Sequence, residues 1–218
     1  MSDLMKLDVV DVDGAIREAE EAVEGDTRAD LFRKAAIGGG AALGGGLLLG
    51  GMPEFAAAGR PSVRQDTAIL NFALTLEYLE ADFYQKAERD AGLTGDVKTT
   101  TRVVTKHEFA HVRFLKRVLG AKAVKKPRFD FGDATKDQAK FLKLAVVLED
   151  TGVKAYSGQA PRIKQRVVLR AAASILSVEA RHASRFRSLN NQLFAPRTFD
   201  DADSMKQVLR AAGPFIKK

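Results

Sequence analysis

The sequence predicts an all-α protein built on a bundle of four long helices, and three observations lead to that prediction. From Gln65 onward, apolar residues recur with a period near 3.6, and no segment alternates convincingly as a strand would. Aromatic residues make up only 7% of the chain, and tryptophan is absent, which favours helices over a β-sandwich. The 218 residues are enough for one domain with a substantial core.

The first two helices form a predicted hairpin. The first helix starts near Gln65, runs through "LNFALTLEYLEADFYQKAERDAG" and is closed by Gly92. The second extends from about Asp96, a suitable N-cap residue, to about Gly120. The polar stretch that follows, "AKAVKKPRFDFGDAT", could span up to ~50 Å at ~3.3 Å per residue. It is therefore long enough to return along the bundle as a crossover.

A second hairpin and a tail follow the crossover. The third helix starts near Thr135 and passes through "KFLKLAVVLEDTGVKAY", and Pro161 with the charged "RIKQR" marks the next turn. The fourth helix is expected to run to just before Pro196, and a short helix is expected at residues 204–212. We therefore expect residues 61–195 to form the bundle and residues 196–218 a C-terminal tail.

Residues 1–60 read as a separate acidic lead and export segment. Residues 1–27 carry nine acidic groups against two basic ones. The basic "TRADLFRK" comes next, then a Gly-rich apolar segment at residues 35–52 and the small residues "AAA". This is the order of an export signal, and "TRADLFRK" resembles a twin-arginine signal, although Ala29 stands where a second arginine is expected.

The apolar segment contains eight glycines, which makes it a poor permanent membrane span. We expect export to the periplasm or cell envelope, with membrane contact only through this N-terminal segment. The alternatives are an uncleaved anchor or a flexible linker, and the protein would be cytoplasmic if the signal is not functional.

Composition excludes some chemistry and suggests one class of partner. The chain has no cysteine, which rules out disulfides, zinc–thiolate sites, iron–sulfur clusters and a thiol nucleophile. Residues 59–218 carry a net charge of +13, so they could attract an acidic polymer, although a well-solvated surface explains this charge equally well. The densest basic patch lies in the crossover, at Lys122, Lys125, Lys126 and Arg128.

Two of the only three histidines end a Glu-x-x-His motif. Glu108 and His111 lie in "KHEFAH", and Glu179 and His182 lie in "SVEARHA". Residues three apart lie on the same face of a helix, so each pair can reach the same ion.

The two hairpins look like copies of one another. Glu77 precedes Tyr84 by seven residues on the first helix, and Glu149 precedes Tyr156 by seven on the third. Glu149 follows Glu77 by 72 residues, and the second Glu-x-x-His follows the first by 71. Within each hairpin the glutamates lie about equally far from the turn, so they share one height in the bundle.

Four carboxylates and two imidazoles would then meet in the core. Buried, unpaired carboxylates are very unfavourable, so the cluster requires cations. Two divalent ions would balance the four negative charges. Mixed oxygen and nitrogen ligands without thiolate suit iron or manganese.

This pattern resembles the ferritin-like superfamily of dimetal-carboxylate bundles over residues 65–194. The stretches "LNFALTLEYLEADFY", "HEFAH" and "SVEARHA" are most similar to exported bacterial members related to plant desiccation-response proteins. The resemblance implies two Fe (or Mn) ions per chain, bridged by Glu108 and Glu179. It implies these six metal ligands: Glu77, Glu108, His111, Glu149, Glu179 and His182.

Several residues keep alternative interpretations. Glu80 competes with Glu77 as a ligand, but it matches Gly152 in the second copy, so we interpret it as a surface or supporting group. His107 is interpreted in the same way. Tyr84 and Tyr156 are either redox-active, hydrogen-bonded to ligand carboxylates, or ordinary core tyrosines.

The expected function is a di-iron oxidoreductase that reacts with O2 or peroxide in stress protection and oxidises Fe(II). The chain lacks the cysteines of a rubredoxin-like centre, so a rubrerythrin-type electron path is excluded. The alternative is a non-catalytic stress or desiccation protein that binds acidic polymers. A homo-oligomer is compatible with either function.

Overall fold

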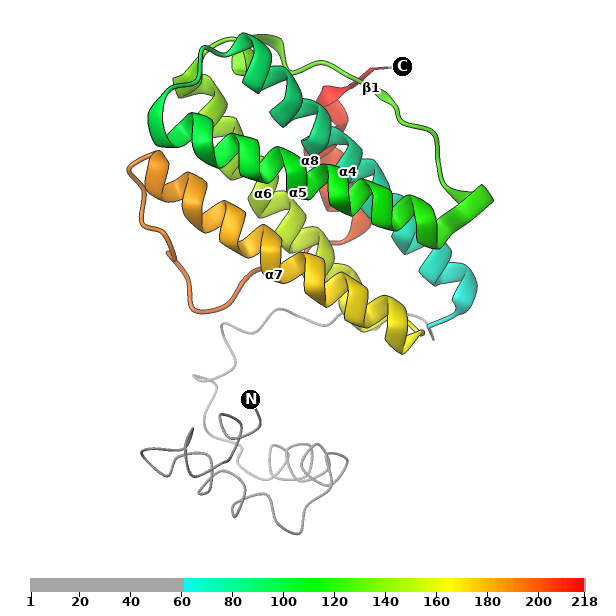
Figure 1. Cartoon of the computed structure of the whole chain (residues 1–218). Coiled ribbons are helices and arrows are strands. Elements are labelled where there is room, and N and C mark those ends of the chain that lie inside the picture. Colours follow the sequence, from blue (N-terminus) through cyan, green and yellow to red (C-terminus); the bar gives the residue numbers. More distant parts are fainter. Residues whose placement is uncertain (1–60, 218) are drawn as a thin grey trace, which may run out of the picture. The chain divides into compact units, whose positions relative to one another are not determined.

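The computed structural model describes residues 61–217. Four long helices form two hairpins that pack together into one bundle (Figure 1). The first hairpin consists of α4 (Val63–Asp90) and α5 (Gly95–Leu119), and the second of α6 (Gln138–Gln159) and α7 (Arg166–Leu189). The predicted all-α four-helix bundle is therefore confirmed. The acidic lead and export segment lie outside the described residues.

Local chemistry fixes where the helices begin and end. The side chain of Ser62 accepts a hydrogen bond from the Gln65 amide at the start of α4, and Asp137 accepts one from the Lys140 amide at the start of α6. The prediction for the end of α7 was wrong. This helix ends at Leu189, well before Pro196, because Asn191 adopts a left-handed conformation (φ 56°) that asparagine tolerates better than most residues.

The crossover is confirmed, and it contains one feature that the sequence did not predict. Its strand β1 (Arg128–Phe129) pairs in antiparallel fashion with β2 (Ile216–Lys217), so the C-terminal tail lies against the crossover (Figure 1). Two-residue strands are too short to show alternation. Three short 3-10 turns complete the connections: η2 (Gly120–Lys122), η3 (Gly132–Thr135) and η4 (Ala160–Arg162).

The short helix α8 (Met205–Ala212) is also confirmed, and it packs on α6. It starts with a capping box between Ser204 and Gln207. Just before it, the Asp203 amide donates to the Lys154 carbonyl of α6. After α8 comes the 3-10 turn η5 (Gly213–Phe215), which leads into β2.

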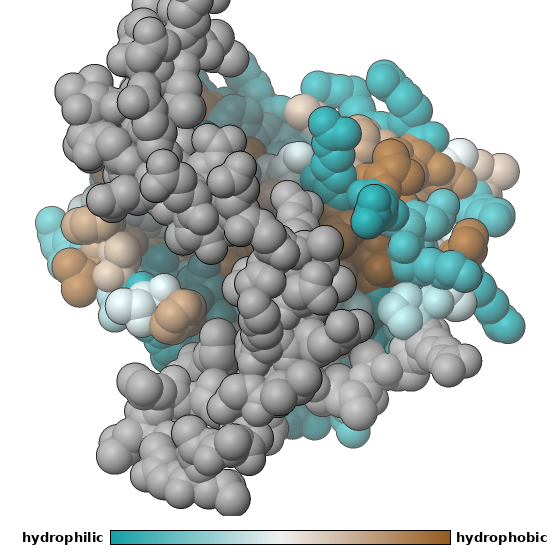
Figure 2. All heavy atoms as spheres, turned by 90° about the horizontal axis from the view of Figure 1, so that it is seen from below, coloured by the Kyte–Doolittle hydropathy of each residue, from teal (hydrophilic) through white to brown (hydrophobic). Residues whose placement is uncertain are grey.

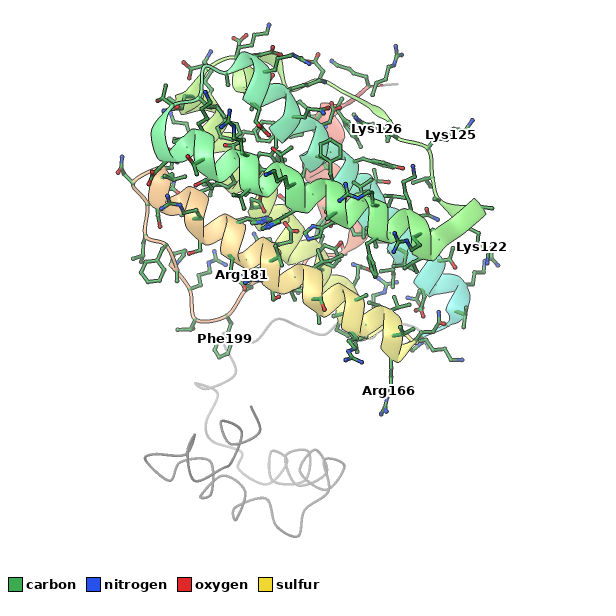
Figure 3. All side chains as sticks on the ribbon, in the orientation of Figure 1. Lys122, Lys125, Lys126, Arg166, Arg181 and Phe199 are labelled. Carbon is green, nitrogen blue, oxygen red and sulfur yellow. The ribbon has the colours of Figure 1, made fainter. Side chains whose placement is uncertain are left out.

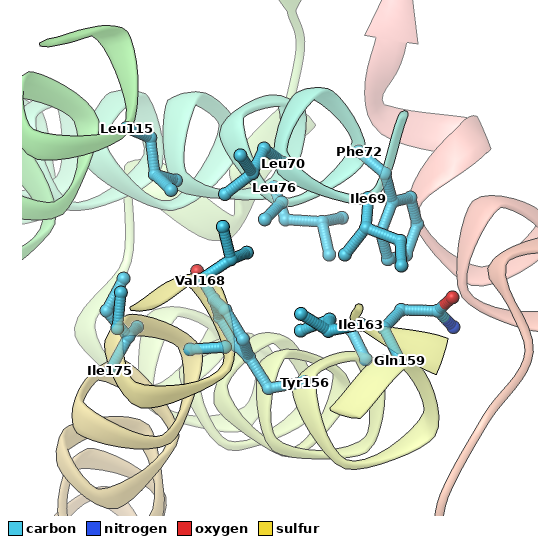
Figure 4. Close-up of a pocket in the computed structure, with 14 residues that line it drawn as sticks. Ile69, Leu70, Phe72, Leu76, Leu115, Tyr156, Gln159, Ile163, Val168 and Ile175 are labelled. Carbon is cyan, nitrogen blue, oxygen red and sulfur yellow. The ribbon is translucent and has the colours of Figure 1, made fainter. Parts of the chain in front are cut away.

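Two apolar regions lie on either side of the bundle's middle. Towards the α4–α5 turn, buried aromatic rings pack on one another, with Phe83 stacked on Phe141 at 5.2 Å between centroids and Tyr84 on Phe186 at 5.4 Å. At the opposite end, aliphatic side chains line a small cavity (Figure 4). Polar residues buried between these two regions are therefore shielded from water.

The surface formed by the described residues mixes hydrophilic and hydrophobic side chains (Figure 2). Phe199 in the loop after α7 projects outward (Figure 3) and is 59% exposed. Among residues 61–217, no helix has the length and hydropathy that crossing a membrane requires.

Candidate metal centre

All six residues with predicted ligand roles meet in the middle of the bundle. They come from all four long helices: Glu77 from α4, Glu108 and His111 from α5, Glu149 from α6, and Glu179 and His182 from α7. The four glutamates are fully buried, and the two imidazoles are almost so. The sequence predicted that the glutamates of each hairpin lie at the same height in the bundle. The structure agrees, because the six side chains contact one another there.

The cluster divides into two sets of converging atoms. In the first, which we call the His111 set, His111 Nδ1 lies 3.1 Å from a Glu77 oxygen, 3.2 Å from Glu108 Oε2 and 3.2 Å from Glu179 Oε1. The four ligand atoms of this set all lie within 4.8 Å of one another.

The second, the His182 set, repeats the arrangement with the other carboxylate oxygens. His182 Nδ1 lies 3.2 Å from Glu108 Oε1, 3.3 Å from Glu149 Oε2 and 3.8 Å from Glu179 Oε2. Glu108 and Glu179 thus present one oxygen to each set. A carboxylate placed in this way can bridge two cations, which is the role that the resemblance implied for both residues.

The two tyrosines connect the hairpins. The Tyr156 hydroxyl of α6 donates a hydrogen bond to Glu77 Oε1 of α4 at 2.5 Å, and the Tyr84 hydroxyl of α4 donates to Glu149 Oε1 of α6. Both tyrosines are core residues, and both hydrogen-bond to these carboxylates; a redox role stays a prediction. Each tyrosine orients the glutamate of the other hairpin, so neither hairpin can build the arrangement alone.

Burial opposes the ionisation of this many carboxyl groups. It raises the pKa of Glu77 to about 8, and burial followed by the charge of Glu179 raises the pKa of Glu149 well above its usual range. Burial also acts on Glu179, but hydrogen bonds from both histidines outweigh it and lower its pKa to about 2. Without a metal ion, the cluster therefore holds protons on some of its carboxyl groups.

The histidines respond in the opposite direction. Burial disfavours the imidazolium of His182, yet the Glu149 charge and hydrogen bonds to three carboxylates raise its pKa to about 12. Burial likewise disfavours the imidazolium of His111, but hydrogen bonds to Glu108, Glu179 and Glu77 raise its pKa. The protein alone thus balances its carboxylates with two imidazolium cations at the positions from which ligand nitrogens would face a metal ion.

Two observations show that the cluster fits metal ions. Apart from the histidine–carboxylate contacts described above, several of its buried atoms have no hydrogen-bond partner among the described residues: Glu108 Oε1, Glu149 Oε2, both oxygens of Glu179 and His182 Nδ1. In addition, two ligands at right angles on an ion with ~2.1 Å bonds lie ~3.0 Å apart. The His111 contacts of 3.1–3.2 Å are close to that spacing.

One of the two interpretations of Glu80 was wrong. It is not a surface group, because its side chain is buried, with 3% exposure, and the interpretation as a supporting group stays a prediction. Burial, followed by the charges of Glu179 and Glu149, raises its pKa well above the usual range. The sequence did contain a signal: Gly152, the matched position on α6, leaves room for it, because a Cβ there would lie 3.3 Å from Glu80 Oε1.

His107 contacts the cluster from outside. Its Nδ1 lies 2.9 Å from His182 Nε2, and the two rings stack with centroids 5.2 Å apart. His107 itself is exposed. His107 therefore combines the two roles considered for it, because it lies at the surface and also contacts a candidate ligand.

The cavity at the far end of the bundle borders Tyr156 (Figure 4). Its volume is about 20 Å³, and most of its walls are aliphatic, with Ile69, Ile163 and Ile175 among them. Apolar cavities of this size stay dry. The centre is therefore shielded from bulk water on the cavity side as well as on the aromatic side.

In the basic patch of the crossover, Lys122, Lys125 and Lys126 are spaced along the connection (Figure 3). Lys126 pairs with Asp82 of α4, and Asp82 also pairs with Lys86 at 2.8 Å. Part of the patch is therefore neutralised within the fold.

Comparisons with known proteins agree on the fold. The sequence matches the family model of the ferritin-like domain over residues 65–192. Among solved structures, it is similar to a hypothetical protein from Methanococcus jannaschii, with a TM-score of 0.51 and 12% identity over 72% of this chain and 96% of that one. Likeness at this identity concerns the fold alone. No curated protein matches the sequence.

Proposed function

Because the chain belongs to the ferritin-like domain family, we propose that its buried cluster binds two iron or manganese ions and supports their reaction with O2 or peroxide. The observation that carries the proposal is the division of the cluster into two sets that share Glu108 and Glu179. A single structural ion pair would not require two matched sets of converging oxygen and nitrogen atoms.

Each residue would have a definite task in this centre. Glu108 and Glu179 would hold both ions, and Glu77 and Glu149 would each hold one, kept in orientation by a tyrosine hydroxyl from the other hairpin. His111 and His182 would bind through Nδ1, the atom that faces the carboxylates, after losing the proton there.

The bound ions would supply the electrons and the Lewis acidity for reducing O2 or peroxide. The protein's own contribution is to fix the ligands and to exclude water. Tyr84 and Tyr156 also hold protons next to Glu149 and Glu77, because burial followed by those carboxylates raises the pKa of each phenol well above its usual range. Both phenols therefore stay neutral donors at physiological pH.

Oxygen and nitrogen ligands without thiolate favour iron or manganese over softer ions. An exported protein with such a centre could oxidise Fe(II) or remove peroxide in the cell envelope under stress. Export itself depends on residues 1–60, which lie outside the described residues, and it remains part of the proposal.

A second candidate function is a non-catalytic stress or desiccation role in which the basic surface binds an acidic polymer. The exposed side chains of Lys122 and Lys125 favour it. In such a protein the cluster would have a structural role only and would catalyse no reaction. Assembly into a homo-oligomer is compatible with both candidates.

Metal analysis tests the ligand set. Protein purified from its own host should contain close to two metal ions per chain. Glu108→Ala and Glu179→Ala should each lose most of both ions while the helical circular dichroism signal survives, because each removes a shared carboxylate. Glu88→Ala is the matched control, since Glu88 is exposed on α4. Loading near two ions in either of the first two variants would refute the assignment.

Reactivity separates the two candidates. Apo protein loaded with Fe(II) without oxygen and then exposed to air should change its near-ultraviolet absorbance only if the centre is redox-active. Binding of the apo protein to DNA that weakens steeply with salt, together with no absorbance change, would favour the polymer-binding role.

A further inference from the structure

Two departures from the internal duplication fall on the same half of the cluster. The first is Glu80, whose matched position on α6 is Gly152. The second is His107, whose matched position on α7 is Val178. Every other cluster residue has a partner of its own type in the other hairpin, so these two positions show where the halves of the centre differ.

Glu80 is directed at the His182 set. A Cβ built on Gly152 would lie 3.3 Å from Glu80 Oε1 and 3.6 Å from Glu179 Oε2. Both oxygens therefore face the space beside Gly152, which is free because glycine has no side chain. Glu179 Oε2 is the oxygen on the His182 side, whereas Oε1 of the same residue faces His111.

His107 contacts the same half of the centre. Its Nδ1 meets His182 Nε2, so the ring nitrogen of His182 that faces away from the carboxylates has a fixed partner. For His111 the described residues show contacts only through Nδ1. The imidazole ring of His182 is therefore held on both sides, whereas that of His111 is held through one nitrogen.

We infer that the two metal positions are inequivalent and that Glu80 is an additional carboxylate ligand at the His182 set. This inference rests on the proposed dimetal function and deepens it. A carboxylate buried to 3% exposure beside other carboxylates keeps its charge only with a cation within reach, and Glu80 Oε1 faces the same space beside Gly152 as Glu179 Oε2 of the His182 set. One more negative ligand and one fixed imidazole make this position the tighter of the two.

Calorimetric titration of the apo protein with Mn²⁺ tests the inference without using catalysis. The unchanged protein should bind two ions in two resolved steps. Glu80→Gln keeps the side-chain shape and should weaken the tighter step at least tenfold while leaving the weaker step unchanged. Gly152→Ala, which crowds the Glu80 oxygen, should weaken the same step. Glu88→Gln, exposed on the same helix, should bind as the unchanged protein does.

The histidines identify which position is affected. Glu80→Gln should add nothing to the loss caused by His182→Gln, but it should add its full effect to that of His111→Gln. Two unchanged steps in Glu80→Gln, or an equal weakening of both, would overturn the inference while leaving the dimetal proposal standing. Failure of the unchanged protein to bind either Mn²⁺ or Fe²⁺ would instead refute the dimetal proposal. Helical circular dichroism of each variant checks that it has folded.

Discussion

Replacing Glu77 with glutamine should stabilise the apo protein at neutral pH. The pKa of Glu77 is raised from 4.5 to about 8 in the fold, mainly by burial. A carboxyl group with a raised pKa contributes stability below its unfolded pKa and loses it as pH rises towards the folded value. For this shift, the loss between pH 5 and pH 7 is roughly 2–3 kcal/mol.

The other titrating groups do not reverse this slope, and Glu80 and Glu149, whose pKa values burial also raises, add to it. His182, with its pKa raised to about 12 from 6.5, loses its stabilising contribution only as pH rises above 6.5. Glu179, whose pKa is lowered from 4.5 to about 2, loses its stabilising contribution only as pH falls below 4.5. The lowered pKa of His107 acts against the trend, but this residue is exposed and contributes little.

Thermal unfolding followed by circular dichroism at pH 5, 6 and 7 measures the effect. Glu77 alone should lower the melting temperature of the apo protein by about 5–10 °C over this range, taking about 2–4 °C per kcal/mol for a chain of this size. Glu77→Gln should remove this share of the fall and melt higher than the unchanged protein at pH 7, whereas Glu88→Gln should keep the full slope. Bound metal should also flatten the curve, because ions replace the missing protons.

A flat apo curve between pH 5 and 7, together with a Glu77→Gln variant that melts like the unchanged protein at every pH, would refute the reasoning. It would mean that Glu77 does not share a buried site with other carboxylates. A fall in the apo protein that persists fully in Glu77→Gln would assign the titration to other members of the cluster.

Three further predictions concern other parts of the chain. Tyr156→Phe removes the hydrogen bond to Glu77 and should weaken metal binding severalfold in a Mn²⁺ titration, with the fold intact; unchanged affinity would show that the hydroxyl does not orient the carboxylate. Gly158→Ala should lower the melting temperature by several degrees, because its Cβ would overlap the Asp203 carbonyl oxygen; an unchanged value would show that the tail yields freely. Residues 1–60 fused to a folded reporter should carry it to the cell envelope, and a reporter that stays in the cytoplasm would favour a linker.

The sequence predicted much of the fold because the helices are long and strongly periodic. It also predicted which six residues would meet, since the matched offsets between hairpins fix their relative heights. Two-residue strands carry no such signal, so the pairing of β1 with β2 could not be foreseen. The early end of α7 depends on the backbone conformation of a single residue, Asn191.

The finer features of the site depend on contacts between the hairpins. The duplication argument favoured Glu77 over Glu80 because Gly152 looked like a missing partner. In the structure that glycine is what leaves room for Glu80. Likewise, the stacking of His107 on His182 joins α5 to α7, and no spacing within either helix predicts it.

The reciprocal tyrosine bonds have a consequence for how the protein matures. While the first hairpin stands alone, Glu77 lacks its Tyr156 donor, and Glu108 faces water, not the second half of the centre. The metal-binding geometry therefore comes into being only when the two hairpins dock. In the proposed dimetal centre, the complete set of ligands would therefore be available to the ions only after the two hairpins have docked.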